Sequence, residues 1–201
     1  MTSQKQAAPD HPIHELLAKR WSPYVFANRP VTDSDLRSLF EAVRWAASSY
    51  EQPWRYILAA KANTSEFARL LSCLVEGNQA WAKTAPVLAI GCTSLNFAKN
   101  NKPNAAAAHD LGLASASLTI EATARGLFVH QMIGILPDKL RGLYRVPEGV
   151  QPLTGLAIGY AADLDNVPEK YRERDLAPRT RKPLAEFVFG DEWGSASSLV
   201  R

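Results

Sequence analysis

The segment from Pro86 to Cys92 is an almost unbroken apolar run, and it constrains the fold more than any other part of the chain. Such a run is typical of a strand that is buried on both faces, so other elements must cover each side of it. A chain of 201 residues, 46% of them hydrophobic, can bury a core of this kind as one domain. The sequence therefore predicts an α+β protein with a mixed central sheet of about four strands covered by helices.

Periodic patterns predict the elements around this strand. Thr32 followed by Asp35 is typical of a capping box that opens a helix. The longest helical pattern is rich in Ala and Ser, which let another backbone approach closely, so we expect a central helix that can also form a subunit contact. The expected helices cover residues 11–20, 32–43, 63–74, 104–125 and 137–143, and the expected strands cover residues 56–60, 86–92, 127–131 and 153–160.

The two ends of the chain lack such patterns. Residues 1–10 read as a disordered lead-in, and residues 11–201 read as a single domain. Periodicity disappears over residues 163–201, a long stretch for a compact domain to leave without an element of its own. Because Phe187, Trp193 and their neighbours are too apolar for a disordered tail, we expect this tail to dock on a partner subunit in an intertwined homodimer.

Charge and cysteine content exclude several classes of protein. A net charge of +3 is too small to indicate nucleic acid as the main partner. Cys73 and Cys92 lie in apolar surroundings without a CxxC motif, which favours reduced core thiols and a cytoplasmic location. No apolar run is long enough to span a membrane, so we expect no membrane association.

No pattern for side-chain catalysis or metal binding is present. The sequence lacks a GxGxxG motif, a Gly-x-Ser-x-Gly elbow and histidines at metal-ligand spacing. His109 and Asp110 are adjacent within a helical pattern, so we expect their side chains to point to different faces. His130 is more simply explained as a satisfied strand histidine than as a catalytic one. We therefore predict no catalytic side chain and no metal ligand.

The segment Ala47–Arg55 joins a helical pattern to a strand pattern through Ser48, Ser49, Gln52 and a Pro-Trp pair. Core packing does not need so many small polar side chains. A ligand with several oxygen acceptors and an aromatic plane would use all of them. This segment is therefore the first candidate binding site.

Basic residues gather near both ends of the chain. Arg20 and Ser22 are two residues apart and can reach one phosphate together, and Arg179 and Arg181 form a second basic group. Each group alone could be a solvated surface charge. Together with Ser48 and its neighbour, they favour one shared phosphate site.

These residues resemble the motifs of the nitroreductase family, flavoproteins that hold FMN between two subunits. The family opens with a pattern close to Arg-Arg-Ser-x-Arg-x-Phe, in which Arg20, Ser22 and Phe26 match whereas Trp21 and Tyr24 depart. The resemblance implies a phosphate-binding role for the polar members of this pattern.

Three further segments carry the resemblance. The family motif Pro-Ser-Ser, aromatic, Asn, Gln-Pro-Trp matches residues 47–54, although Ala47 replaces the Pro and the Asn is missing. Residues 77–81 are similar to a segment whose Asn touches the flavin or the ribityl chain, and residues 126–134 are similar to a loop whose backbone N–H groups face flavin N5 and O4. The resemblance thus implies cofactor binding by Arg20, Trp21, Ser22, Ser48, Ser49, Gln52, Asn78, Met132, Ile133, Gly134, Arg179 and Arg181.

The implied activity is an FMN-dependent oxidoreductase. NAD(P)H would give hydride to the flavin, and a nitroaromatic, quinone or similar small acceptor would take it up. The cofactor carries this chemistry, so an obligatory protein acid or base is not expected. Two alternatives remain open at this stage: other flavin chemistry, such as dehalogenation, enoate reduction or flavin cleavage, or a non-enzymatic FMN-binding or nucleic-acid-binding protein.

Overall fold

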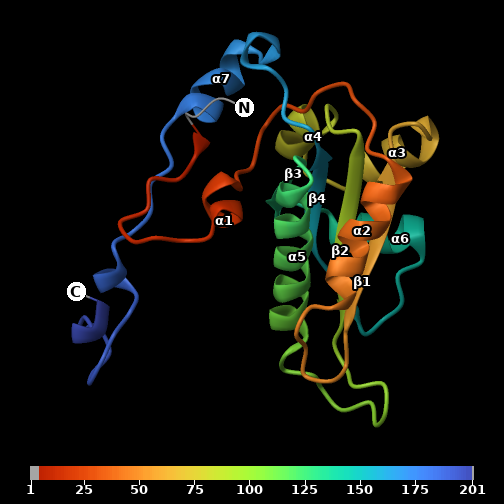
Figure 1. Cartoon of the computed structure of the whole chain (residues 1–201). Coiled ribbons are helices and arrows are strands. Elements are labelled where there is room, and N and C mark those ends of the chain that lie inside the picture. The colour runs from red at the N-terminus through yellow and green to blue at the C-terminus, as the bar shows by residue number, and fades with distance from the viewer. Residues whose placement is uncertain (1–4, 201) are drawn as a thin grey trace.

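The computed structural model describes residues 5–200. These residues fold around a four-stranded sheet with the strand order β1-β2-β4-β3 (Figure 1). Helices cover both faces of the sheet, so the predicted α+β architecture is confirmed. The strands are β1 (Trp54–Ala60), β2 (Val87–Ser94), β3 (Phe128–Met132) and β4 (Val150–Gly159).

All three pairings between neighbouring strands in the described chain are antiparallel, so the sheet is not mixed as predicted. Strand β3, which follows the crossover helix α5 (Ala107–Ala124), does run parallel with β2. However, β4 lies between β2 and β3 and pairs antiparallel with both. The parallel strands are therefore never direct neighbours.

Two predicted helix starts follow from capping residues. The Thr32 side chain accepts a hydrogen bond from Asp35 N, and Asn63 accepts one from Glu66 N, so both predicted starts are confirmed. Among the described residues, no helix is both long enough and apolar enough to cross a membrane. The remaining helices are α1 (Glu15–Lys19), α2 (Asp33–Arg44), α3 (Thr64–Leu71), α4 (Glu76–Ala82), α6 (Pro137–Tyr144) and α7 (Glu169–Leu176), and the 3₁₀ turns are η2 (Leu164–Asn166), η3 (Leu184–Glu186) and η4 (Ser198–Val200).

Two expected helices differ from the structure, and one further helix is not predicted. The first, expected over residues 11–20, begins only at Glu15, with His14 as its N-cap. The helix expected over residues 63–74 ends at Leu71, and a separate helix, α4, follows it. Helix α7 lies in the tail that was expected to lack an element of its own.

Strand β2 is buried along nearly its whole length, as its apolar run predicted, because each face of the sheet carries its own core. On one face Ala89 packs in a cluster with residues of α2 and α5, such as Leu118. On the other face Ile90 packs in a cluster with residues of α3, α4 and α6, such as Trp81. Successive strand residues point to opposite faces, so one strand serves both cores.

Both ends of the described chain form an extension that we call the terminal arm, residues 5–22 and 163–200. Figure 1 shows the arm to the left of the sheet, with α1 and α7 on it. The two halves leave the sheet side by side, where Phe26 and Ala161 form an isolated β-bridge. Helix α1 also packs against α5.

Two residues of the predicted disordered lead-in, Lys5 and Ala7, form hydrogen bonds within the arm. Lys5 Nζ donates to the carbonyls of Arg174 and Ala177 at 2.8 and 2.6 Å, and Ala7 N donates to Ala18 O at 2.9 Å. The acceptors of Lys5 belong to the end of α7, far away in sequence, and the acceptor of Ala7 belongs to the nearby helix α1. The disordered lead-in therefore stays a prediction for residues 5–10, and residues 1–4 lie outside the described residues.

The last part of the tail carries apolar side chains that face solvent. The rings of Phe189 and Trp193 pack edge to face with centroids 5.1 Å apart. Even so, Phe187 is 56% exposed, Trp193 93% and Leu199 92%. Docking of residues 163–201 on a partner subunit stays a prediction.

Candidate functional site

Three guanidinium groups gather on the terminal arm, those of Arg20, Arg179 and Arg181. Burial lowers the pKa of Arg20, and the charges of the other two lower it further. Burial and the charge of Arg181 likewise lower the pKa of Arg179. The ion pairs found among the described residues include none of these three groups. Two half-buried cations, Arg20 and Arg179, and the exposed Arg181 without a paired carboxylate suit the binding of an anion.

The fold brings these residues together through the end of α1. Arg179 Nη1 donates to Ala18 O at 2.7 Å and to Lys5 O at 3.3 Å, and so lies against the C-terminal turn of that helix. Arg20 follows the same turn and donates to Ser22 Oγ at 3.2 Å. The terminal arm therefore carries four predicted phosphate-binding residues from both ends of the chain: Arg20, Ser22, Arg179 and Arg181.

An aromatic junction of Tyr24, Trp81, His130 and Tyr171 ties this arm to the sheet. The Tyr24 ring stacks on Tyr171 of α7 at 5.7 Å between centroids and meets Trp81 edge-on at 5.4 Å. Its backbone N–H donates to the buried carboxylate of Asp175 at 3.2 Å. The junction sets where α7 lies relative to α4 and β3.

His130 lies at the centre of this junction. Its Nδ1 is 2.9 Å from Pro23 O, and a carbonyl can only accept, so Nδ1 carries the proton. The ring stacks on Trp81 at 4.2 Å, and burial lowers the pKa of the imidazole. A neutral, hydrogen-bonded histidine agrees with its interpretation as a satisfied strand residue.

Asn78 and Gly134, predicted from separate segments, are in direct contact. Asn78 Nδ2 donates to Gly134 O at 3.0 Å, and Asn78 Oδ1 accepts from Trp81 Nε1 at 3.3 Å. A Cβ on Gly134 would lie 2.4 Å from Asn78 Nδ2 and 2.8 Å from Val75 Cγ2. The close approach of the Asn78 and Val75 side chains to the Gly134 α-carbon therefore favours glycine here.

The residues before this glycine differ in exposure. The Met132 side chain is buried, at 7% exposure, whereas that of Ile133 is 73% exposed. On the same face of the sheet as α4, the Trp21 ring packs edge-on against Phe128, 5.5 Å between centroids. Trp21 thus contributes to packing.

The loop between α2 and β1 carries the other predicted ligands. Ser49 N donates to Asp110 Oδ2 at 2.9 Å, and Gln52 N donates to Ser48 Oγ at 3.4 Å. Tyr50 and Gln52 have φ values of +64° and +48°, which L-residues rarely adopt. The loop is thus held in an uncommon conformation.

Sequence reasoning missed Asp110. Its side chain is 2% exposed, and Oδ1 lies 3.1 Å from His109 Nδ1, so the expectation that the two side chains point apart is wrong. Adjacent helical residues diverge at Cβ, but the imidazole is long enough to fold back over its neighbour. Only the long-range bond to Ser49 could have identified Asp110, and a single sequence does not contain it.

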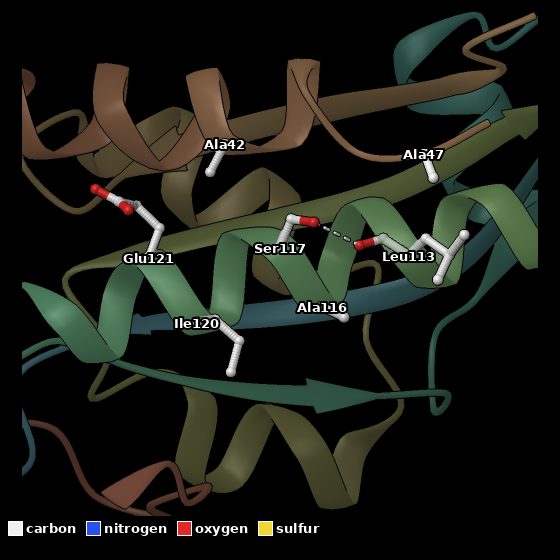
Figure 2. A pocket seen from close by; sticks show the side chains of 7 residues that line it. All are labelled: Ala42, Ala47, Leu113, Ala116, Ser117, Ile120 and Glu121. Atoms are coloured by element: carbon white, nitrogen blue, oxygen red, sulfur yellow. Dashed lines mark hydrogen bonds between the residues drawn. The ribbon is translucent and has the colours of Figure 1, made fainter. Parts of the chain in front are cut away.

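A groove of about 460 Å³ runs between α2 and α5 (Figure 2). Small side chains dominate its lining, and Ala47 at one end directly precedes Ser48. None of the predicted cofactor residues lines it. The lining residues are Ala42, Ala47, Leu113, Ala116, Ser117, Ile120 and Glu121.

The predicted site residues therefore form three groups within one chain. The arginine cluster with Ser22 lies on the arm, and Asn78 contacts Gly134 beside α4. Figure 1 shows α4 at the upper end of the sheet and the loop with Ser48 and Ser49 at the lower end. The single chain does not bring this loop to the other two groups.

Comparisons with known proteins agree with this architecture. The family model described as "Nitroreductase family" matches residues 17–160. A solved structure described as an oxidoreductase containing FMN has a TM-score of 0.88 and 32% identity over 97% of this chain and 100% of that one.

Two curated relatives extend the comparison. An uncharacterised 15.4 kDa protein of Mycolicibacterium smegmatis is 35% identical over 68% of this chain and 90% of its own length. The FMN reductase [NAD(P)H] of Bacillus subtilis (strain 168) is 28% identical over 69% of this chain and 61% of its own length. Together with the fold and the match of the family model, these similarities establish that the chain belongs to the nitroreductase family.

Proposed function

We propose that this protein is an FMN-dependent oxidoreductase that transfers hydride from NAD(P)H to a small acceptor such as a nitroaromatic or a quinone. The uncompensated cluster of Arg20, Arg179 and Arg181, with the hydroxyl of Ser22, is the observation that carries the proposal. Guanidinium groups bind phosphate oxygens in pairs, and burial strengthens each contact. The donors therefore suit the dianionic phosphate of FMN.

The names of relatives support this cofactor. The solved relative at 32% identity is described as an oxidoreductase containing FMN, and the Bacillus subtilis relative is named an FMN reductase [NAD(P)H]. We infer the same cofactor and the same type of electron donor for this chain.

The other two groups suit the rest of the cofactor. Backbone N–H groups of residues 132–134 would face the ring edge, and Asn78 would hold that loop in place. Bound FMN supplies a reversible hydride carrier, and N–H donors at its edge favour the reduced, anionic form. For a quinone the balance is quinone + NAD(P)H + H⁺ → hydroquinone + NAD(P)⁺.

We propose further that the active form is an intertwined homodimer. Ser48, Ser49 and Gln52 lie at the end of the sheet opposite α4, so a partner subunit would have to bring its own copies of them to the flavin. Two features support a subunit contact: the groove of small side chains on α5, and the exposed Phe187 and Trp193 of the tail. The tail would then cover apolar surface of the partner. We place the protein in the cytoplasm, where its two unpaired cysteines stay reduced.

An absorbance spectrum tests the cofactor directly. The purified protein should show the bands of oxidised flavin at one FMN per chain, and anaerobic NADPH should bleach them. Flavin that binds but is not reduced by NADH or NADPH would indicate a carrier and not an enzyme. A nitroaromatic that leaves the reduced flavin unoxidised would redirect the search to other flavin chemistry.

Variants of the arginine cluster test the site. Arg20→Ala and Arg181→Ala should each weaken FMN binding about ten- to a hundredfold, because a hydrogen bond to a charged group contributes about 1.5–3 kcal/mol. Arg37→Ala, at an exposed position of α2, is the matched control for loss of one positive charge and should keep its FMN. Equal FMN retention in all three variants would refute the assignment.

A further inference from the structure

Tyr50 combines two features that seldom occur together. Its side chain is 99% exposed, and its φ of +64° lies in the left-handed region. Glycine or asparagine adopts this conformation with less strain than a tyrosine does. An aromatic residue held there and turned to solvent needs an explanation outside the core.

The surrounding structure maintains this conformation. On one side Ser49 N donates to the buried carboxylate of Asp110 at 2.9 Å. On the other side the Glu51 carboxylate accepts from Ala98 N at 2.6 Å. Both neighbours of Tyr50 are therefore fixed to other parts of the chain, α5 and the loop after β2. Strain persists only where contacts of this kind enforce it.

Tyr50 lies in the sequence among proposed cofactor ligands. Ser48 and Ser49 precede it, and Gln52 follows it with Gln52 N bonded to Ser48 Oγ at 3.4 Å. A tyrosine ring has only two rotatable side-chain bonds, so it presents a large flat surface with little loss of entropy on binding. With flavin bound at this loop as proposed, the exposed ring would border the place where the acceptor meets the flavin.

We infer that Tyr50 determines acceptor specificity: its ring stacks on the acceptor, which is a planar, electron-poor aromatic or quinonoid compound. The inference rests on the proposed function, because it needs flavin beside Ser48, Ser49 and Gln52. Offset or edge-to-face ring contacts stabilise such a complex beyond its buried area, and an aliphatic acceptor gains nothing comparable.

Acceptor binding can be measured without turnover. FMN-loaded, oxidised protein is titrated with 4-nitrobenzyl alcohol in the absence of reductant, and the change in flavin absorbance gives the dissociation constant. Tyr50→Ala should raise this constant about tenfold, and Tyr50→Phe should restore it to within about twofold, because the ring and not the hydroxyl makes the contact. Trp45→Ala, at an exposed aromatic position just before the same loop, should leave it unchanged.

Steady-state kinetics separate this role from a structural one. With NADPH as donor, Tyr50→Ala should lower kcat/KM for menadione about tenfold, chiefly through KM. It should leave the rate with ferricyanide, a small acceptor without an aromatic plane, within about twofold. Equal effects on both acceptors, an unchanged dissociation constant, or loss of FMN from Tyr50→Ala would each overturn the inference.

Measurements on the parent protein distinguish failure of the proposed function from failure of the inference about Tyr50. If it binds no FMN, the proposed function fails and the inference fails with it, before any variant is made. If the parent protein binds FMN and NADPH reduces it, but Tyr50→Ala behaves like Trp45→Ala, only the inference fails.

Discussion

At the scale of single residues, Gly134 is the position where one added methyl group has the clearest consequence. Its carbonyl accepts from Asn78 Nδ2, and its α-carbon faces that same amide. A Cβ 2.4 Å from Nδ2 cannot be accommodated without displacing either the amide or the loop. Residues 132–134 carry the N–H groups proposed to face the flavin, so the displacement would reach the cofactor.

We therefore expect Gly134→Ala to weaken FMN binding at least tenfold and to shift the flavin absorbance bands. Equilibrium dialysis and the visible spectrum of loaded protein measure the two effects. The cause is steric, since no Gly134 side chain contributes to the site.

Gly77→Ala in α4 is the matched control, because nothing lies within 4 Å of a Cβ added there. It should bind FMN like the parent, and the protein should be slightly more stable because alanine favours a helix. If Gly134→Ala also bound FMN like the parent, the clamp between Asn78 and Gly134 would have no part in the site.

The sequence predicted which chemical groups individual residues carry, but it did not predict which other residues they contact. Arg20 and Arg181 were identified by the donors they carry, and the structure brings them together. The bond from Ser49 to Asp110 spans 61 positions and has no local signature. The same holds for the contact between Asn78 and Gly134, which depends on how α4 packs beside the end of β3.

At the scale of elements, α2 was predictable from its apolar periodicity and the Thr32 cap, α5 from the length of its Ala- and Ser-rich helical pattern, and β2 from its apolar run, whereas α4 and α7 were not predictable. Helix α4 has only seven residues and no side-chain cap, and two helical stretches so close in sequence read as one. Helix α7, with the sequence EKYRERDL, has almost no apolar stripe. It is stabilised by tertiary contacts of Tyr171 and Asp175, which periodicity does not reveal.

This dependence gives a prediction for α7. Asp175→Ala removes a buried acceptor and leaves Tyr24 N unpaired, which destabilises the arm by about 1–3 kcal/mol. Because Arg179 and Arg181 follow α7, FMN binding should weaken at least tenfold. The sheet cores lie elsewhere, so limited proteolysis should cut first within residues 163–200 while the sheet stays intact.

Two variants control for this experiment. Glu173→Ala changes an exposed carboxylate of the same helix and should have little effect. Asp175→Asn keeps an oxygen acceptor for Tyr24 N and should lie between the alanine variant and the parent. An arm that remains protease-resistant in Asp175→Ala would show that the stacked rings alone hold α7.

At the scale of the whole molecule, the two-faced sheet could be predicted from one apolar run, but the shape of the arm could not. Polar residues such as Lys5 bond across the arm to the end of α7, and these bonds join segments at opposite ends of the chain. The proposed division of the site between two subunits likewise depends on which end of the sheet each site loop reaches. Only the fold provides that information.

The groove on α2 and α5 supports a test of assembly. Ala116 lies on an exposed face of α5 and lines the groove, so Ala116→Glu would place a charge in the proposed subunit contact. We expect light scattering to report twice 22.1 kDa for the parent and a single chain for the variant, with loss of FMN.

Ala62→Glu, at an exposed position after β1, adds the same charge away from the groove and should remain dimeric. An Ala116→Glu protein that stays dimeric and yellow would remove α5 from the interface and leave the tail as the remaining candidate contact.

The bridge between Phe26 and Ala161 has a mechanical consequence. A force applied between the two ends of the chain would first load the paired halves of the arm, where Lys5 holds α7 and Arg179 holds α1. Lys5 precedes Ala18 along one half, and the partners of Lys5 precede Arg179 along the other, so the two halves run in the same direction and a pull on the chain ends would load these contacts together, in shear. Tension would reach the sheet only after the bridge had parted. In an optical-trap experiment, the arm would therefore extend in a single step before the sheet ruptured.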